Sequence, residues 1–334
     1  RISGSPQNAD LLRCLDAVAR WSGRIDLAFL VGSALDVLGA ASDEQRTRAR
    51  AREHFEPTRP ARQLGKDSLL PLLQPDLSPE ARQIVDLVCE IGTEVDRLEP
   101  GRFGVGRRDR IHPRDSCQQR EAIQAMLELV GLPMGDFYVG GTEPGLVAGF
   151  LRKNTVHWVL GTGVSMPLTP PRKQAVALQV AANLSGTLPL IHRSPHGRAE
   201  LVCAVLDAAG CPRPEGIPRE PPEGLLRLAT KHMSRRARKA LPGLVQGLGS
   251  GHRGSEASIA AVEQATRQTR RVALILCGDL EASMQELLAD HEGTASPAPS
   301  LAQRLAQSPA AQDLLHAWLS PQSLALRHQL GFGS

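Results

Sequence analysis

Residues 136–186 contain the feature that most restricts the fold of this chain. The segments Phe137–Gly140 and Val156–Leu160 are short runs rich in aromatic and β-branched residues, which predicts two short strands. A proline-rich turn, Pro167–Pro171, follows, and the run Gln174–Leu184 then carries mostly apolar side chains. An apolar run of this kind predicts a buried helix. We therefore expect a strand pair that leads into a buried helix.

The composition favours helices in the rest of the chain. Hydrophobic residues make up 41% of the 334 residues and charged residues 22%, as in globular proteins. Aromatic residues make up only 3%, so the core has to be built from Leu, Ala, Val and Ile, which favours packed helices. The sequence therefore predicts a mainly α (α+β) fold, a helical bundle with a small β-hairpin or a short sheet.

Apolar periodicity and capping residues predict where the helices lie. Residues 1–58 are expected to form a helical-hairpin region with three helices between residues 8 and 55. Residues 59–334 are expected to form a mainly helical domain. Its predicted helices are Pro79–Leu98 capped by Ser78, a helix from the cap Asp115–Ser116 to Gly131, Arg198–Ala209, Glu223–Thr230, Ser234–Leu248 with a kink at Pro242, Glu256–Leu288 with a break at Gly278, and two short helices that end at Leu330.

Charge and cysteine usage restrict the partners and the compartment. The net charge of +4 is mild, and it favours neither a nucleic-acid nor a membrane partner. No apolar run approaches the roughly 20 residues of a membrane span. The six cysteines lie far apart and form no C-x-x-C, which fits a reducing compartment and predicts a cytoplasmic protein. Because the chain begins with Arg1, we interpret it as a fragment of a longer protein.

Two histidines four residues apart are the best candidates for metal binding. His192 and His196, with Glu200 nearby, have a spacing that places two ligands on one helix face. Pro195 separates the histidines, however, and Ser194 is a typical cap for the helix that follows, so they are not expected to share a face. His157, which alternates with apolar residues on a predicted strand, is interpreted as a structural or surface histidine rather than a ligand. The sequence predicts no cofactor and no assigned metal site.

Two glycine-rich segments resemble phosphate-binding loops. Gly249–Gly254 matches G-x-G-x-x-G, but a predicted helix precedes it where the dinucleotide fingerprint needs a strand, so we interpret it as a linker. Gly101–Arg108 offers Arg102, Arg107 and Arg108 beside glycines that let backbone amides approach an anion. An exposed basic loop is the favoured interpretation, since the chain has no G-x-x-x-x-G-K-[ST].

One acidic residue and one basic cluster each have a functional and a structural interpretation. Asp279 follows a long apolar run, so it is either a buried catalytic carboxylate or, as we favour, the cap that restarts a helix after Gly278. The segment Lys231–Lys239, with Arg235 and Arg236, is either a site for an acidic partner or the solvated face of an amphipathic helix. The second interpretation is favoured because Leu241, Leu244 and Val245 follow at helical spacing. Single-strand and RNA binders also commonly interleave aromatic residues with the basic ones, and this cluster has none.

Several short motifs together resemble a known class of protein. They are Arg107–Ile111, Phe137–Val139, His157–Gly161, Leu276–Glu281 and Leu324–Gly331. In these motifs the chain resembles the non-repeat C-terminal region of large bacterial tetratricopeptide proteins, and its first helices are similar to the end of such an array. The resemblance implies a helical protein-interaction region within a larger bacterial protein.

That region is in turn distantly similar to gluzincin-type zinc peptidases, through its order of strand, strand and helix. An active gluzincin carries an H-E-x-x-H helix, whereas the equivalent positions here are Val180, Ala181 and Leu184. The resemblance therefore implies a degenerate peptidase scaffold to which no catalytic residue can be assigned.

The leading hypothesis from the sequence is a non-catalytic protein-interaction or regulatory module with a protein partner. A hydrolase of metallopeptidase type with an unrecognised site, around His192, His196 and Glu200, is the alternative. A nucleic-acid-associated module is the second alternative, with Arg102, Arg107, Arg108, Arg235 and Arg236 as its contacts. The chain carries no H-E-x-x-H, G-x-S-x-G or Walker A motif.

Overall fold

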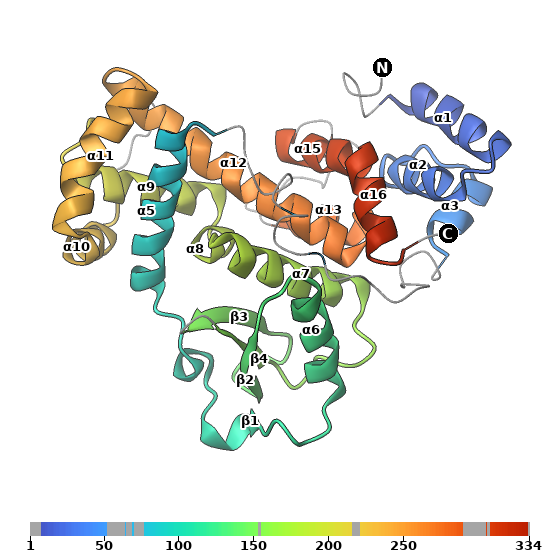
Figure 1. Ribbon diagram of the computed structural model, residues 1–334, viewed down its shortest axis with the longest axis horizontal. Coiled ribbons are helices and arrows are strands. Elements are labelled where there is room, and N and C mark those ends of the chain that lie inside the picture. The colour runs from blue at the N-terminus through green and yellow to red at the C-terminus, as the bar shows by residue number, and fades with distance from the viewer. Residues whose placement is uncertain are drawn as a thin grey trace, which may run out of the picture.

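The computed structural model describes residues 8–51, 64, 69, 77–152, 155–215, 221–289, 305 and 308–332. These residues form a mainly helical protein with one small mixed sheet, which confirms the predicted fold class (Figure 1). The helices are α1 (Ala9–Trp21), α2 (Ile25–Val37), α3 (Asp43–Ala49), α5 (Pro79–Asp96), α6 (Gln118–Leu129), α7 (Pro170–Ser185), α8 (Leu188–Ile191), α9 (Pro195–Ala208), α10 (Glu223–His232), α11 (Arg235–Leu248), α12 (His252–Cys277), α13 (Leu280–Ala289), α15 (Pro309–Trp318) and α16 (Pro321–Gln329).

The helix α12 connects three apolar cores. Its first half packs with α5, α9, α10 and α11 through residues such as Val262. Its second half contributes Val272 and Ile275 to the core between the sheet, α6 and α7. Leu274 belongs to a third core, with α1, α2, α13 and α15. The helices within 1–58 therefore share a core with the C-terminal helices, and Figure 1 shows both groups at the same end of the molecule.

The sheet has four strands where the sequence predicted two. They are β1 (Arg110–Ile111), β2 (Met134–Val139), β3 (Val147–Arg152) and β4 (Thr155–Leu160), in the order β1-β2-β4-β3. The two predicted strands, β2 and β4, are parallel neighbours with Phe137 opposite Trp158. The hairpin is formed by β3 and β4, which are antiparallel.

The strand β3 was not predicted from the sequence, because Gly149 occupies a position where a strand usually carries an apolar side chain. A Cβ atom on Gly149 would lie 3.0 Å from the indole ring of Trp158, so a larger residue would displace the ring.

The buried helix α7 also covers the free edge of the sheet. Gln179 Oε1 accepts a hydrogen bond from the backbone N–H of Gly149 at 3.3 Å, and Asn183 Nδ2 donates to the carbonyl of Gly149 at 3.1 Å. The amides on this otherwise apolar helix therefore satisfy backbone groups of an edge strand, which would otherwise be open to pairing with another chain.

Three serine residues expected to cap helices do so in the structure. The hydroxyls of Ser42, Ser78 and Ser194 accept hydrogen bonds from backbone N–H groups of the helices that follow them. The predicted cap of α6 is wrong: α6 begins at Gln118, after Cys117. The Asp115 carboxylate instead accepts a hydrogen bond from the N–H of His112 at 3.1 Å and closes a turn before the helix.

Other helix ends also differ from the prediction. The helix α9 starts at Pro195, three residues earlier than predicted, and α12 starts at His252 rather than Glu256. The third N-terminal helix ends at Ala49, and the end predicted for it, residue 55, lies outside the described residues. The helix α11 runs through Pro242.

A buried arginine joins the C-terminal helices to α12. Arg327 on α16 donates a hydrogen bond to the carbonyl of Gly278 at 3.0 Å. Its guanidinium lies 4.8–5.1 Å from the ring centroids of Phe29, Trp318 and Phe332. Burial lowers the pKa of Arg327 to about 10, so this side chain stays charged at neutral pH. Cation–π attraction and one charged hydrogen bond thus compensate for its desolvation.

We expect Arg327→Ala to lower the free energy of unfolding by about 3 kcal/mol, because it removes the packing with three rings and leaves the Gly278 carbonyl unpaired. Urea denaturation followed by circular dichroism measures this loss. Arg236→Ala on α11, where the arginine is exposed, is the matched control and should change stability by less than about 0.5 kcal/mol. Equal losses in the two variants would contradict a structural role for Arg327.

Candidate functional site

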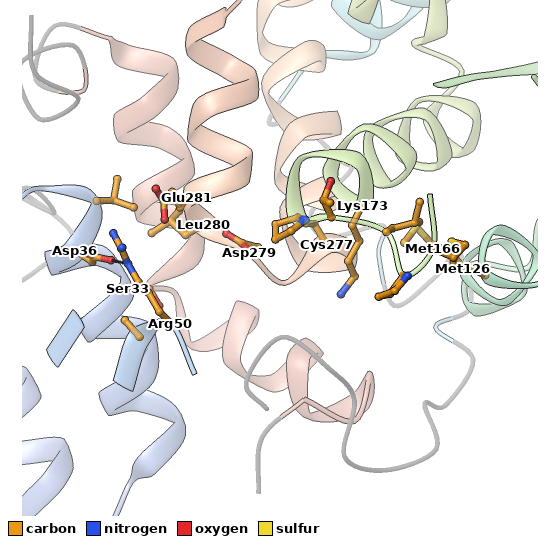
Figure 2. A pocket seen from close by; sticks show the side chains of 17 residues that line it. Ser33, Asp36, Arg50, Met126, Met166, Lys173, Cys277, Asp279, Leu280 and Glu281 are labelled. Carbon is orange, nitrogen blue, oxygen red and sulfur yellow. Dashed lines mark hydrogen bonds and ion pairs between the residues drawn. The ribbon is translucent and has the colours of Figure 1, made fainter. Parts of the chain in front are cut away.

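A pocket of about 660 Å³ lies where α12 turns into α13 (Figure 2). Helices α2 and α3 form one wall, α6 and the start of α7 form another, and the loop before α7 completes the lining. This volume lies in the range of small-molecule and peptide sites. The lining residues are Ser33, Asp36, Val37, Ala49, Arg50, Ala122, Met126, Met166, Pro167, Leu168, Thr169, Pro170, Lys173, Cys277, Asp279, Leu280 and Glu281.

The turn between α12 and α13 is fixed by a glycine and an acidic cap. Gly278 has φ +74°, a conformation that favours glycine. A Cβ atom there would also lie 3.2 Å from the Arg327 guanidinium. The Asp279 carboxylate accepts a hydrogen bond from the N–H of Ala282 at 3.0 Å, which is the geometry of the predicted helix cap. The two helices therefore meet at a defined angle beside the pocket.

One end of the pocket is apolar and adaptable. Met126 comes from α6, and Met166, Pro167 and Leu168 come from the loop that follows the sheet. Figure 2 shows the two methionines close to each other at this end. Methionine side chains are flexible and polarisable, and they fit ligands of varied shape.

The other end of the pocket is polar. Arg50 Nε donates to Asp36 Oδ2 at 2.8 Å, and this hydrogen bond is the main cause of a raised pKa of Arg50. Figure 2 shows this pair beside Ser33, with Glu281 across from it. Ser33 is 6% exposed, and its buried hydroxyl has no hydrogen-bond partner among the described residues. An unpaired buried hydroxyl costs about 1–3 kcal/mol, which a ligand's polar group can offset.

Opposite charges lie near the middle of the pocket. Burial raises the pKa of Asp279, while the helix-cap hydrogen bonds and the charge of Lys173 act in the opposite direction. The Lys173 ammonium lies 5.3 Å from the ring centroid of Phe332. These groups are placed where they can pair with a polar atom, but they do not form a nucleophile with a base.

The thiol in the pocket wall is unreactive. Cys277 is fully buried, and burial raises its pKa to about 12. Since the thiolate is the nucleophilic form, this thiol stays protonated at neutral pH.

Only two of the three metal-binding candidates, His196 and Glu200, lie on the same helix. His192 follows the short helix α8, whereas His196 and Glu200 lie one turn apart on α9. His196 Nε2 is 3.2 Å from Glu200 Oε1, a partly exposed pair. Among the described residues there is no cluster of three or more His, Cys, Asp or Glu side chains that could hold a metal ion.

Ion pairs that join helices surround the metal-binding candidates. Arg198, buried on α9, donates two hydrogen bonds to Glu263 of α12 at 2.7 and 2.8 Å. Arg193 pairs with Asp96 at the end of α5 at 2.6 Å. The polar residues of this region therefore hold α5, α9 and α12 together.

The basic loop Gly101–Arg108 is exposed and lies away from the pocket. Arg102 donates to the backbone carbonyl of Asp96, and the Asp109 carboxylate accepts from the N–H of Gly106 at 2.8 Å. Arg107 and Arg108 are exposed in a short 3-10 turn. The backbone N–H of Gly106, which a bound phosphate would need, is thus already hydrogen-bonded to the Asp109 carboxylate.

The basic cluster with Arg235 and Arg236 is also exposed. These residues and Lys239 line a shallow surface hollow at the start of α11. Leu241 and Val245 of the same helix are buried against the core, as predicted for an amphipathic helix. Gly249–Gly251 connects α11 to α12, which agrees with the interpretation as a linker.

His157, the remaining histidine considered in the sequence analysis, has a structural role. His157 Nδ1 accepts a hydrogen bond from the N–H of Asp136 at 3.1 Å, and Nε2 lies 3.1 Å from the Thr155 hydroxyl. Its ring stacks on Phe150 with the centroids 5.8 Å apart. Burial is the main cause of a lowered pKa of His157, so the neutral form with both ring nitrogens paired is favoured.

Of the pocket residues, sequence analysis singled out only Asp279. The helix cap predicted at Asp279 also predicted the position of the turn between α12 and α13. The other polar residues come from segments far apart in the chain, and no local spacing connects Ser33, Arg50 and Lys173.

Comparison of the chain with protein-family models, with curated proteins and with solved structures gives no match. The resemblance to tetratricopeptide proteins and to gluzincins therefore remains a prediction. A search of the helices within the described ranges finds none with the length and apolar character required to cross a bilayer.

We expect Asp279→Asn to gain stability relative to the wild type as pH rises from the ordinary aspartate pKa of 3.8 through the raised pKa of Asp279 in the native state. The raised pKa of Asp279 means that the native state keeps a proton that the unfolded chain has already lost, so wild-type stability falls as pH rises through that window. Asparagine keeps the cap but carries no charge.

Urea denaturation across this pH range measures the difference in unfolding free energy between the two proteins. Asp279→Ala, which loses the cap, should be less stable than Asp279→Asn by about 1 kcal/mol at every pH. A difference between Asn and wild type that is constant with pH would contradict the burial of a charged Asp279.

Proposed function

We propose that this protein is a non-catalytic interaction module that binds a short apolar segment of a partner protein in the pocket at the α12–α13 turn. The pocket itself carries this proposal, because an adaptable apolar end and a polar end lie within one cavity of about 660 Å³. A few side chains of a peptide fill such a volume.

The apolar end and the polar end of the pocket match the apolar side chains and the polar groups of a peptide. Apolar side chains fit between Met126, Met166 and Leu168, where burial of each contributes about 1.5–3 kcal/mol. Backbone amides or a polar side chain fit the other end, where the Ser33 hydroxyl and the Arg50 and Glu281 charges supply hydrogen-bonding groups. This division of contacts supports a peptide rather than a purely apolar ligand.

The chemistry of the pocket supports binding without catalysis. The wall thiol, Cys277, is protonated, and Asp279 is engaged as a helix cap. The helix α7, which corresponds to the catalytic helix in the resemblance to gluzincins, has Val180 and Ala181 fully buried in the core. These positions pack against neighbouring side chains and do not line the pocket.

A random peptide library displayed on phage and selected on the purified protein tests this function. We expect enrichment of short peptides with two or more apolar residues. Ala122→Trp places a large ring in the pocket from α6 and should weaken these peptides at least about tenfold, as measured by fluorescence polarisation. Ala125→Trp is the matched control, since Ala125 is exposed on the same helix and should leave binding unchanged.

Two outcomes would contradict the proposal. Peptides that bind the Ala122→Trp variant as tightly as the wild type would place the site elsewhere. Purified protein that holds one equivalent of zinc and cleaves peptides would replace the interaction module with the metallopeptidase alternative.

A further inference from the structure

Four basic side chains gather on the surface where α10 meets α11. They are Lys231 at the end of α10 and Arg235, Arg236 and Lys239 on the first turns of α11, all exposed, and we name them the α11 basic patch. Arg238 Nη2 donates to the carbonyl of Thr230 at 3.0 Å, which holds the end of α10 against the start of α11. Figure 1 shows both helices at the opposite end of the molecule from α2 and α3. The patch is separate from the pocket, which none of its residues lines.

The α11 basic patch does not join helices, unlike the arginines that form ion pairs elsewhere in this fold. Arg48 on α3, for example, pairs with the buried Asp16 of α1 at 3.2 Å. Within the described ranges, none of the four patch side chains forms an ion pair. Glu94 of α5 approaches the same segment at the partly buried His232, with 3.6 Å between Oε2 and Nδ1. The charge of the patch is therefore left uncompensated by the described residues.

Repulsion within the patch lowers the stability of α11. Lys239 is four residues from Arg235 and three from Arg236, so these side chains are neighbours on the helix surface. Like charges at these spacings destabilise a helix. The first turn of α11 has no acidic residue, and its two arginines lie at the positive end of the helix dipole. These cations therefore weaken the helix that carries them, and an anion beside them relieves the repulsion.

The patch surrounds a hollow that suits a carboxylate. Arg235, Arg236 and Lys239 line it together with Ala240, whose small side chain leaves room between the three longer ones. A guanidinium binds a carboxylate through two parallel hydrogen bonds, and a lysine ammonium contributes a further charge. The charge of the patch thus selects an acidic ligand.

The two helices also distinguish among acidic ligands. Proteins that bind single-stranded nucleic acids stack bases on aromatic rings, and neither α10 nor α11 contains Phe, Tyr or Trp. Helices that bind anionic bilayers insert an apolar face, whereas Leu241 and Val245 of α11 are buried in the core. A protein segment rich in carboxylates requires neither stacking nor insertion.

From this arrangement we propose that the α11 basic patch binds a segment of a partner protein that is rich in aspartate and glutamate. The contacts are exposed ion pairs, so the binding is weak, with a dissociation constant in the micromolar range at low salt, and it is screened as salt is added. The proposal does not depend on the ligand of the pocket, because the two sites share no residue.

Fluorescence polarisation with the whole chain tests this binding. The probe is a fluorescein-labelled peptide in which glutamate alternates with serine, and the control peptide has glutamine in place of glutamate. We expect the glutamate peptide to bind and the glutamine peptide not to bind. Affinity for the glutamate peptide should fall at least about fivefold between about 10 mM and about 150 mM salt.

A double charge reversal tests whether the patch is the site. Arg235→Glu combined with Arg236→Glu should weaken the glutamate peptide at least about tenfold. Arg107→Glu combined with Arg108→Glu is the matched control, because these arginines are exposed in the loop before β1 and give the same change in net charge. The control should change the affinity less than about twofold.

The melting temperature of the same variants provides a second measurement. Arg235→Glu combined with Arg236→Glu should raise it by about 1–2 °C, since the new carboxylates face Lys239 and the positive end of the helix dipole. A gain in stability together with a loss of binding separates the patch from a structural role, and it shows that the variant is folded.

Four results would overturn the proposal. They are absence of binding to the glutamate peptide at low salt, an equal loss of affinity in the two double variants, a lower melting temperature of the patch variant, and tighter binding of a fluorescein-labelled oligothymidylate than of the glutamate peptide. The second result would mean attraction by net charge alone, and the last would assign the patch to nucleic acid.

Discussion

The packing of Arg327 against Phe29, Trp318 and Phe332 is the interaction on which the rest of this structure depends. It brings α2, α15 and α16 together around one charged group, and it ties them to the end of α12 through the Gly278 carbonyl. The N-terminal helices are held to the same centre by Trp318, whose indole N–H donates to the carbonyl of Leu30 at 2.9 Å. Segments from the two ends of the chain thereby become one packed unit.

The pocket is a consequence of this arrangement. The helix α12 belongs to all three cores, and its end at Gly278 is the place where two of them meet. Gly278 and the cap Asp279 set the turn from α12 into α13, and the pocket lies at this turn with α2 and α3 on one side and α6 and α7 on the other. The Ser283 hydroxyl on α13 donates a hydrogen bond to Gln174 Oε1 on α7 at 2.8 Å and keeps the two helices in contact. The space that remains is the site that we propose for a peptide.

Local chemistry explains which features could be predicted from the sequence. Ser42, Ser78 and Ser194 act on amides three residues away, so their caps are visible in the sequence. The helix cap predicted at Asp115 was wrong because its carboxylate accepts a hydrogen bond from the backbone N–H of His112, an equally local partner. The strand β3 was missed because Gly149 is required by Trp158, a contact across the sheet. The pocket was missed because its walls come from residues 33 to 281, and no local pattern joins them.

The central claim is that the pocket at the α12–α13 turn binds the ligand. The chain has five methionines, and only Met126 and Met166 line this pocket. The most direct test is a methyl NMR titration of the protein labelled with ¹³C at its methionine methyl groups, using a peptide selected on the protein. The account predicts saturable shifts of the Met126 and Met166 methyl signals and none for Met134, Met233 and Met284. Saturable shifts confined to those three methionines, with Met126 and Met166 unchanged, would contradict it.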